Sequence, residues 1–191
     1  MAFSIRGVIE ALPVMPLHSM AGSWLRAVEL LLSTQTPDER AAAELMIRLM
    51  HEEWDRRRAA PREGDLAEHW PVEAKDRPGS PMSAHGYHVG RRSDLPTVTR
   101  HDILRRCVEE PLMPAFPPEA LAEWGAPHSV MRLKAVLDLI DNQIRSNFTQ
   151  ADKQTAVREW RADLRFLHGL YGDRAGVRWP AMEDRQVRFV G

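Results

Sequence analysis

Two segments near the end of the chain carry apolar residues at helical spacing, and this pattern constrains the fold most. One segment follows Ser129 and the other follows Thr149. Their apolar positions recur three or four residues apart: Leu133, Val136, Leu137, Ile140 and Ile144, then Val157, Trp160, Leu164, Leu167 and Tyr171. Residues at this spacing share one face of an α-helix. Two such helices joined by a turn of about four residues predict an antiparallel αα-hairpin.

Polar residues ahead of these stripes predict where helices begin. Ser129 can cap the first hairpin helix, and Thr149 with Asp152 can cap the second. The strongest signal is the run TPDE at 36–39, where a threonine, a proline and a glutamate three positions after the threonine form a capping box. A helix is therefore predicted over 37–58, paired with an earlier one over about 19–32.

Two further helices are predicted in the second half of the chain. Thr99 can cap a helix that ends before Pro111 and turns Ile103, Leu104, Cys107 and Val108 inward. A short helix, Pro118 to Trp124, should end at Gly125, because a left-handed residue after a helix favours glycine.

Residues 59–98 lack helical periodicity and are rich in proline and glycine. A connection of this length is uncommon inside a compact domain, so we interpret it as an interaction segment, a linker or both. The sequence thus predicts an all-α protein with an N-terminal helical segment (1–58), an irregular connection (59–98) and a C-terminal helical segment (99–191). Its tail is expected to be extended or a small β-hairpin.

Composition excludes some classes of protein. The 26 Lys+Arg and 27 Asp+Glu residues nearly cancel, so no global field draws the chain to nucleic acid or an anionic membrane. One cysteine excludes an intramolecular disulfide framework. No apolar run is long enough to span a membrane, and charges interrupt the apolar start. We expect a cytoplasmic protein, or one within a particle assembled in the cytoplasm.

Candidate chemistry in the sequence is sparse. His85 and His88 lie three apart, and His101 could join them as a metal ligand, but no second tight ligand pair supports a site. Cys107 lies on an apolar stripe and is predicted to be a buried thiol rather than a nucleophile. Most acidic residues, Asp163 among them, are predicted to cap helices or to pair with arginines on helix faces that are exposed to solvent. We therefore predict neither catalytic residues nor a cofactor.

Arginine and tryptophan supply the candidate binding residues. Arg158, Arg161 and Arg165 form a row on the last long helix that could follow a phosphate backbone or belong to a solvated face. Aromatic residues and arginines in irregular segments are typical interface anchors. The predicted partner-binding residues are Trp70, Tyr87, Arg91, Arg92, Arg178, Trp179 and Phe189. For Trp179, packing within the chain is the alternative.

The stretch 141–184 resembles the C-terminal segment of phage tail-fibre and tail assembly chaperone proteins. In that family a helix often carries a W-x-x-x-L/R-x-x-L pattern, followed by a short break and a V-x-W-P close. The matching residues are Trp160, Leu164, Arg165, Leu167, Val177, Trp179 and Pro180. The break here reads YGDRAG, where family members usually have a proline. The resemblance implies a non-enzymatic protein that binds another structural protein during or after virion assembly.

These observations predict a structural or assembly subunit of a larger particle, most consistent with a phage or phage-like one. Its partners are expected to be other protein subunits, either different proteins or further copies of itself, with nucleic acid as a secondary candidate. One alternative is a helical accessory subunit of a nucleoprotein complex that uses the arginine row. Another is a metal-dependent enzyme built on His85 and His88.

Overall fold

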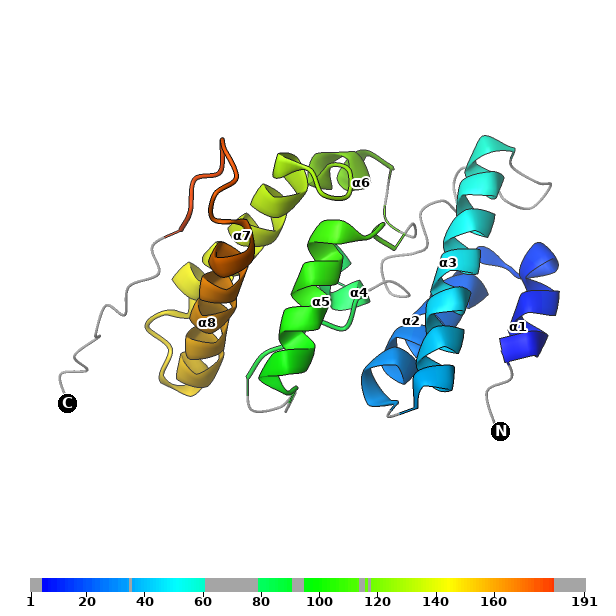
Figure 1. Ribbon diagram of the computed structural model, residues 1–191, viewed down its shortest axis with the longest axis horizontal. Helices are drawn as coiled ribbons and strands as arrows, with labels where there is room; N and C mark the ends of the chain where they lie inside the picture. Colours follow the sequence, from blue (N-terminus) through cyan, green and yellow to red (C-terminus); the bar gives the residue numbers. More distant parts are fainter. Residues whose placement is uncertain are drawn as a thin grey trace. The chain divides into compact units, whose positions relative to one another are not determined.

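The computed structural model describes residues 5–34, 36–60, 79–90, 95–113, 116 and 118–180. Within these ranges the regular structure consists of eight α-helices and two short 3-10 helices, with no β-strand (Figure 1). The prediction of an all-α protein is therefore confirmed for the described part of the chain. In the same ranges, no helix is long and apolar enough to cross a membrane.

The chain divides into two compact units. The first unit comprises Met1–Gly86 and Pro111–Ala122, and the second comprises Tyr87–Glu110 and Glu123–Gly191. This division differs from the three consecutive segments expected from composition. The reason is that each unit combines segments that are far apart in the sequence. The distribution of proline and glycine along the chain does not indicate which distant segments pack together.

The first unit is built from consecutive helices. They are α1 (Ile5–Ala11), the 3-10 helix η1 (Leu12–Val14), α2 (Leu17–Ser33), α3 (Pro37–Ala59) and the single turn α4 (Pro81–Ala84). The helices α2 and α3 pack against each other and correspond to the predicted N-terminal pair. The helix α1 was not predicted, because Arg6 and Glu10 interrupt its apolar run; on the helix they form a surface ion pair at 2.9 Å.

The predicted start of α3 is confirmed. Thr36 is the N-cap, its hydroxyl accepts a hydrogen bond from the backbone N–H of Glu39, and Pro37 is the first helical residue. The carboxylate of Glu39 accepts hydrogen bonds from the hydroxyls of Thr36, at 2.8 Å, and of Thr34. The reciprocal bond of a full capping box is replaced, since the backbone N–H of Thr36 donates to the Thr34 hydroxyl at 3.2 Å.

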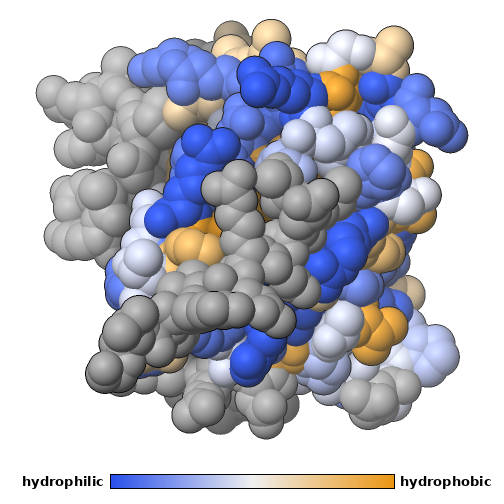
Figure 2. All heavy atoms as spheres, turned by 90° about the vertical axis from the view of Figure 1, so that its left-hand side faces the viewer, coloured by the Kyte–Doolittle hydropathy of each residue, from blue (hydrophilic) through white to orange (hydrophobic). Residues whose placement is uncertain are grey.

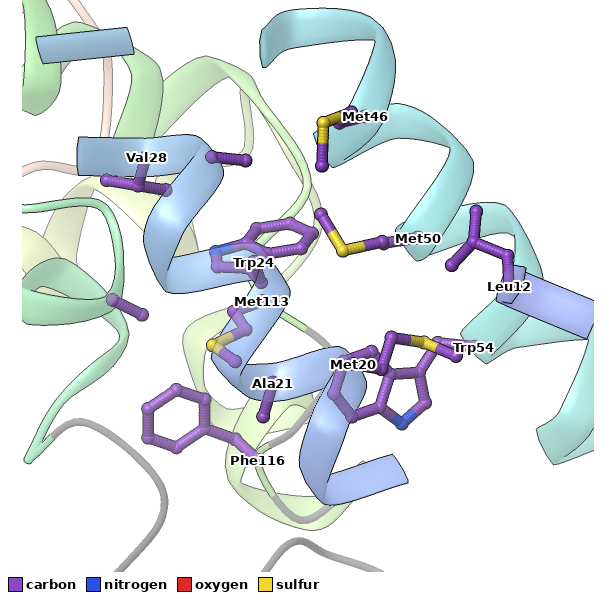
Figure 3. Packing of buried hydrophobic residues seen from close by; sticks show 12 residues of the cluster. Leu12, Met20, Ala21, Trp24, Val28, Met46, Met50, Trp54, Met113 and Phe116 are labelled. Carbon is purple, nitrogen blue, oxygen red and sulfur yellow. The ribbon is translucent and has the colours of Figure 1, made fainter. Parts of the chain in front are cut away.

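Methionine and tryptophan fill the core of the first unit. Figure 3 shows Trp24 of α2 facing Met46 and Met50 of α3, with Met113 and Phe116 entering from the segment after residue 110. All five side chains are buried. Unbranched methionine side chains adapt to the irregular gaps left around large indole rings. The core therefore requires Met113 and Phe116, although they follow α3 by more than fifty positions.

A buried arginine ties the start of the chain to α3. The guanidinium of Arg57 donates to the carbonyl oxygens of Leu12 at 2.8 Å and Met15 at 2.7 Å. Its Nε also donates to the carboxylate of Glu53 at 2.8 Å. Hydrogen bonds from Arg56, joined by those from Arg57, lower the pKa of Glu53 to about 2. Inside the unit, the carboxylate of Glu53 thus balances the charge of Arg57, and the two carbonyl oxygens accept its remaining hydrogen bonds.

Part of the predicted irregular connection is ordered around α4. Ser80 caps this turn in a capping box with Ser83, and Ala84 joins the hydrophobic core. Gly86 follows with a φ of +82°, and a Cβ atom there would collide with the side chain of Leu32. The positive φ favours glycine at this position, and any larger residue would also have to displace the end of the Leu32 side chain.

The second unit contains the C-terminal helices. They are α5 (Thr97–Glu109), the end of α6 (Pro118–Trp124), α7 (Val130–Asn147), the 3-10 helix η4 (Ala151–Lys153) and α8 (Gln154–Tyr171). The helices α7 and α8 are in contact, and α5 contacts both. Their apolar stripes are buried at the predicted positions, from Leu133 to Ile144 on α7 and from Val157 to Tyr171 on α8.

Helix ends in this unit match the predictions in part. Ser129 caps α7 by accepting from the backbone N–H of Arg132, and Gly125 has a φ of +76° after α6, both as predicted. Thr99 is not a cap, because α5 begins two residues earlier at Thr97. Thr149 is not a cap either, because η4 intervenes before α8 and supplies its first turn.

Candidate functional site

Asp163 on α8 is a fully buried carboxylate at the centre of a polar cluster. The hydroxyl of Tyr87 donates to its Oδ2 at 2.7 Å. The guanidinium of Arg100 on α5 donates from Nε to Oδ2 at 3.1 Å and from Nη2 to Oδ1 at 3.2 Å. Nε2 of His101 lies 3.3 Å from Oδ1. Three side chains thus converge on one carboxylate.

Burial sets the protonation states in this cluster. It raises the pKa of Tyr87 well above its usual value of 10, and the charge of Asp163 adds to the effect. It lowers the pKa of His101 below 6.5; Arg100 adds to this lowering, while Asp163 opposes it. At neutral pH the cluster therefore holds a neutral phenol, a largely neutral imidazole and one buried ion pair.

The cluster ties three segments of the second unit together. Glu159 extends it, because its carboxylate accepts from the backbone N–H of Gly90 at 2.6 Å and lies 3.7 Å from Nη1 of Arg100. The ring of His101 stacks on Phe166 with 3.9 Å between the ring centroids. The carboxylate that would have to activate a substrate is thus occupied by internal donors. We assign the cluster a structural role.

The position of Asp163 corrects a prediction. The sequence suggested a solvated helix face, whereas the side chain is 0% exposed. A signal was present, since Asp163 lies three residues after Trp160 and four before Leu167, within the apolar face of α8. Hydrogen bonds from distant segments make this burial possible, and sequence spacing does not reveal them.

The histidines considered as metal ligands lie in different surroundings. His85 is buried edge-on against Trp24, with 6.1 Å between the ring centroids, while His88 is exposed. His101 belongs to the Asp163 cluster. Among the described residues, no group of three or more histidine, cysteine or acidic side chains could hold a metal ion.

Cys107 is fully buried on α5, as predicted. Burial raises the pKa of its thiol to about 12. A nucleophilic cysteine needs the thiolate, which this environment strongly disfavours at neutral pH. Cys107 therefore serves the core as a small apolar side chain.

The predicted arginine row on α8 is not continuous at the surface. Arg158 and Arg165 are exposed, but Arg161 is only 9% exposed, and its guanidinium lies over the ring of Phe148 at 5.3 Å. The spacing of three and four residues placed all three on one side, but Arg161 lies next to the apolar stripe. Two of the three arginines remain accessible to a partner.

The described part of the tail, residues 173–180, packs back onto the second unit. Arg174 donates to the carbonyl of His128 at 2.8 Å, and its guanidinium lies over the ring of Tyr171. Trp179 meets the ring of His168 edge-on, with 4.8 Å between the ring centroids. Trp179 thus makes the internal contact considered as an alternative to an interface role, while Arg178 is exposed.

The remaining predicted partner-binding residues divide into two groups. Tyr87 is buried and donates to Asp163, so we correct its assignment from a surface anchor to an internal one. The others lie outside the described residues: Trp70, Arg91, Arg92 and Phe189.

A groove of about 670 Å³ runs between the end of α6 and the first half of α7. Its apolar lining consists of Trp124, Val130, Met131, Ala135 and Leu139, and its polar lining of Glu123, Lys134, Asp138 and Asn142. Met131 is 55% exposed and Val130 is 39% exposed. This outer face of α7 lies opposite the stripe that packs in the core, and the sequence analysis did not single it out.

Arg132 fixes the wall of this α6–α7 groove. Its buried guanidinium donates to the carbonyl oxygens of Trp124 and Gly125 at the end of α6, at 3.3 and 2.5 Å. It also donates to those of Cys107 and Glu110 at the end of α5, at 3.1 and 2.9 Å. Carbonyls at helix C-termini lack helical partners and carry partial negative charge, which suits a cation. One side chain thus anchors two helix ends beside the groove.

A second groove, of about 620 Å³, lies where α7 ends and α8 begins. Its lining is mixed. Gln143, Asn147 and Gln154 are among its polar side chains, Lys153 and Arg158 are its cations, and Val89, Ala151, Ala156 and Trp160 are apolar.

Comparisons with protein-family models, curated proteins and solved structures found no significant match. Among the coloured residues of the face in Figure 2, hydrophilic ones predominate, with hydrophobic ones interspersed among them. In the α6–α7 groove, five apolar side chains lie beside four polar ones.

Proposed function

We propose that this protein is a non-enzymatic structural or assembly subunit of a larger particle and acts through protein–protein contacts. The observation that carries the proposal is the apolar lining of the α6–α7 groove. A single exposed apolar residue is ordinary on a protein surface. Neighbouring apolar side chains with a polar rim are typical of interaction sites.

The composition of the α6–α7 groove suits a helical or extended protein segment. Met131, Ala135 and Leu139 follow each other at intervals of four residues, so they form one strip along α7. Trp124 stands beside this strip at the end of α6. Tryptophan and methionine are enriched at interface cores, because they bury large areas and adapt their shape.

The surroundings of the reactive side chains also support a non-enzymatic role. Asp163 is occupied by Arg100 and Tyr87, and the thiol of Cys107 is buried and protonated at neutral pH. Catalytic groups are normally poised in a cleft with a vacant position for the substrate. Neither residue lines a groove described above.

A narrower form of the proposal is a subunit of a phage or phage-like virion or tail, assembled in the cytoplasm. It rests on the resemblance of residues 141–184 to tail-fibre and tail assembly chaperone proteins. In this form, α7 and α8 act as an antiparallel hairpin that presents the α6–α7 groove to another subunit. The nucleoprotein alternative is less well supported, because the burial of Arg161 interrupts the arginine row on which it rests.

The experiment measures the mass of complexes that contain the tagged full chain in cells that naturally make it. We expect Met131→Lys to release the chain from its complex, because a charge in the groove opposes apolar contact. Leu170→Lys is the matched control, since Leu170 is 49% exposed on α8 and lies outside the groove. A chain that sediments alone, or whose complex ignores Met131→Lys, would refute the proposal.

A further inference from the structure

We infer that the occupant of the α6–α7 groove is the same groove of a second copy of this chain, in a twofold-symmetric dimer. This inference rests on the proposed function and names the partner of that site. Twofold interfaces bring identical surface patches together, so the patch must complement itself.

The charges on the groove are self-complementary. Lys134 and Asp138 are both exposed on α7 and lie one turn apart. The described residues provide no salt-bridge partner for either. A lysine that precedes an acid by four residues is the less favourable order for pairing within one helix. Both charges therefore remain available to a partner that carries the opposite sign at each position.

An antiparallel copy of α7 supplies those signs. If the twofold axis passes midway between Lys134 and Asp138, Lys134 of each copy faces Asp138 of the other. One contact is thus repeated as two symmetric ion pairs. A parallel pairing in the same register would instead place like charges opposite each other, at a cost in free energy.

The apolar strip fits the same arrangement. Reversing the direction of α7 about this axis brings Met131 of one copy to within one helical turn of Leu139 of the other. Ala135 of both copies then lies near the axis. A small side chain at the crossing lets two helices approach to the 8–10 Å separation that packed helices adopt. Trp124 at the end of α6 extends the contact beyond the helix pair.

The first test is charge reversal in the full chain, with the dimer dissociation constant measured by sedimentation equilibrium. Lys134→Glu alone, or Asp138→Lys alone, should raise this constant about tenfold, because symmetry applies the change to both ion pairs. The double variant K134E/D138K should restore it to near the original value. Arg165→Glu, an exposed reversal on α8, is the control and should leave it unchanged.

The second test is a disulfide across the axis. The chain has one cysteine, the buried Cys107, so an introduced surface cysteine reports without interference. Ala135→Cys should form a disulfide-linked dimer on mild oxidation, because Cα atoms within about 4.4–6.8 Å can be bridged. Arg165→Cys should not form one.

The outcomes separate this inference from the proposed function. A wild-type chain that is monomeric at every concentration, or a dimer indifferent to both reversals, overturns the second-copy inference. If Met131→Lys then still releases a different protein from the cellular complex, the proposed function stands with another occupant. If that complex is also unaffected, both proposals fail.

Discussion

Arg132 offers the sharpest test of how the second unit is held together. The perturbation is Arg132→Met, which keeps an unbranched apolar stem and removes the guanidinium. Arg132 is 3% exposed, and its donors reach four carbonyl oxygens at the ends of α5 and α6. No carboxylate is among these acceptors, so the contribution comes from hydrogen bonds to helix ends.

The magnitude follows from the acceptors left behind. An unsatisfied buried acceptor costs about 1–3 kcal/mol, and water that enters after substitution recovers part of this. Burial lowers the pKa of Arg132, which shows that the folded state bears a desolvation cost that methionine would not. Removing the guanidinium leaves four carbonyl oxygens without their donor, but it also removes the cost of burying the arginine charge. From the balance of the two, we expect Arg132→Met to lower the free energy of unfolding by about 3–5 kcal/mol.

The assay is unfolding in urea, monitored by circular dichroism. If the two units unfold in separate transitions, the transition of the second unit is analysed by itself. Arg132→Lys should lie between wild type and Arg132→Met, because an ammonium keeps the charge but cannot span both helix ends. Arg145→Met on the exposed side of α7 is the control and should change stability by less than about 0.5 kcal/mol. A loss below about 1 kcal/mol for Arg132→Met would refute the reasoning.

Three further predictions concern local features. Thr36→Ala should cost about 1 kcal/mol in the free energy of unfolding of the first unit by urea, because α3 loses its N-cap. Cys107 should react with a thiol reagent only at the rate of unfolding, measured by absorbance; rapid reaction of the folded chain would contradict its burial. Because burial lowers the pKa of His101 below 6.5, the unfolded chain takes up that proton at a higher pH than the folded chain. Stability should therefore fall as pH drops below about 6.5. His101→Phe should weaken this dependence in thermal melts, and the exposed His88→Phe should not.

Local signals in the sequence were sufficient for several helices. The start of α3 at Pro37 and the end of α6 at Trp124 coincide with the predicted residues. In both cases the determinants lie within a few positions: a threonine cap with its proline, and a glycine that adopts a left-handed conformation. The core stripes of α7 and α8 were predictable for the same reason, since a helix converts spacing directly into a face.

The buried polar groups could not be predicted in this way. Asp163 and Arg132 look like surface residues in sequence, because charged side chains are rarely buried without partners. Their partners lie far along the chain, as the pairing of Tyr87 with Asp163 illustrates. The α6–α7 groove was missed for a related reason: Met131 and Leu139 are too few to form a second stripe, and only the neighbouring Trp124 makes them a surface feature.

This chain uses arginine far more often than lysine, and several of the arginines are buried and hold segments of the fold together. Arg57, Arg100 and Arg132 each use the planar guanidinium to bind acceptors from separate segments, which the compact ammonium of lysine cannot do. Five arginines are buried in the described part of the chain, against one buried acidic residue, Asp163. In the described part of the chain, burial therefore removes more basic than acidic side chains from the accessible surface. A surface short of cations is poorly suited to a phosphate backbone, and this favours partners recognised by apolar contact and matched ion pairs.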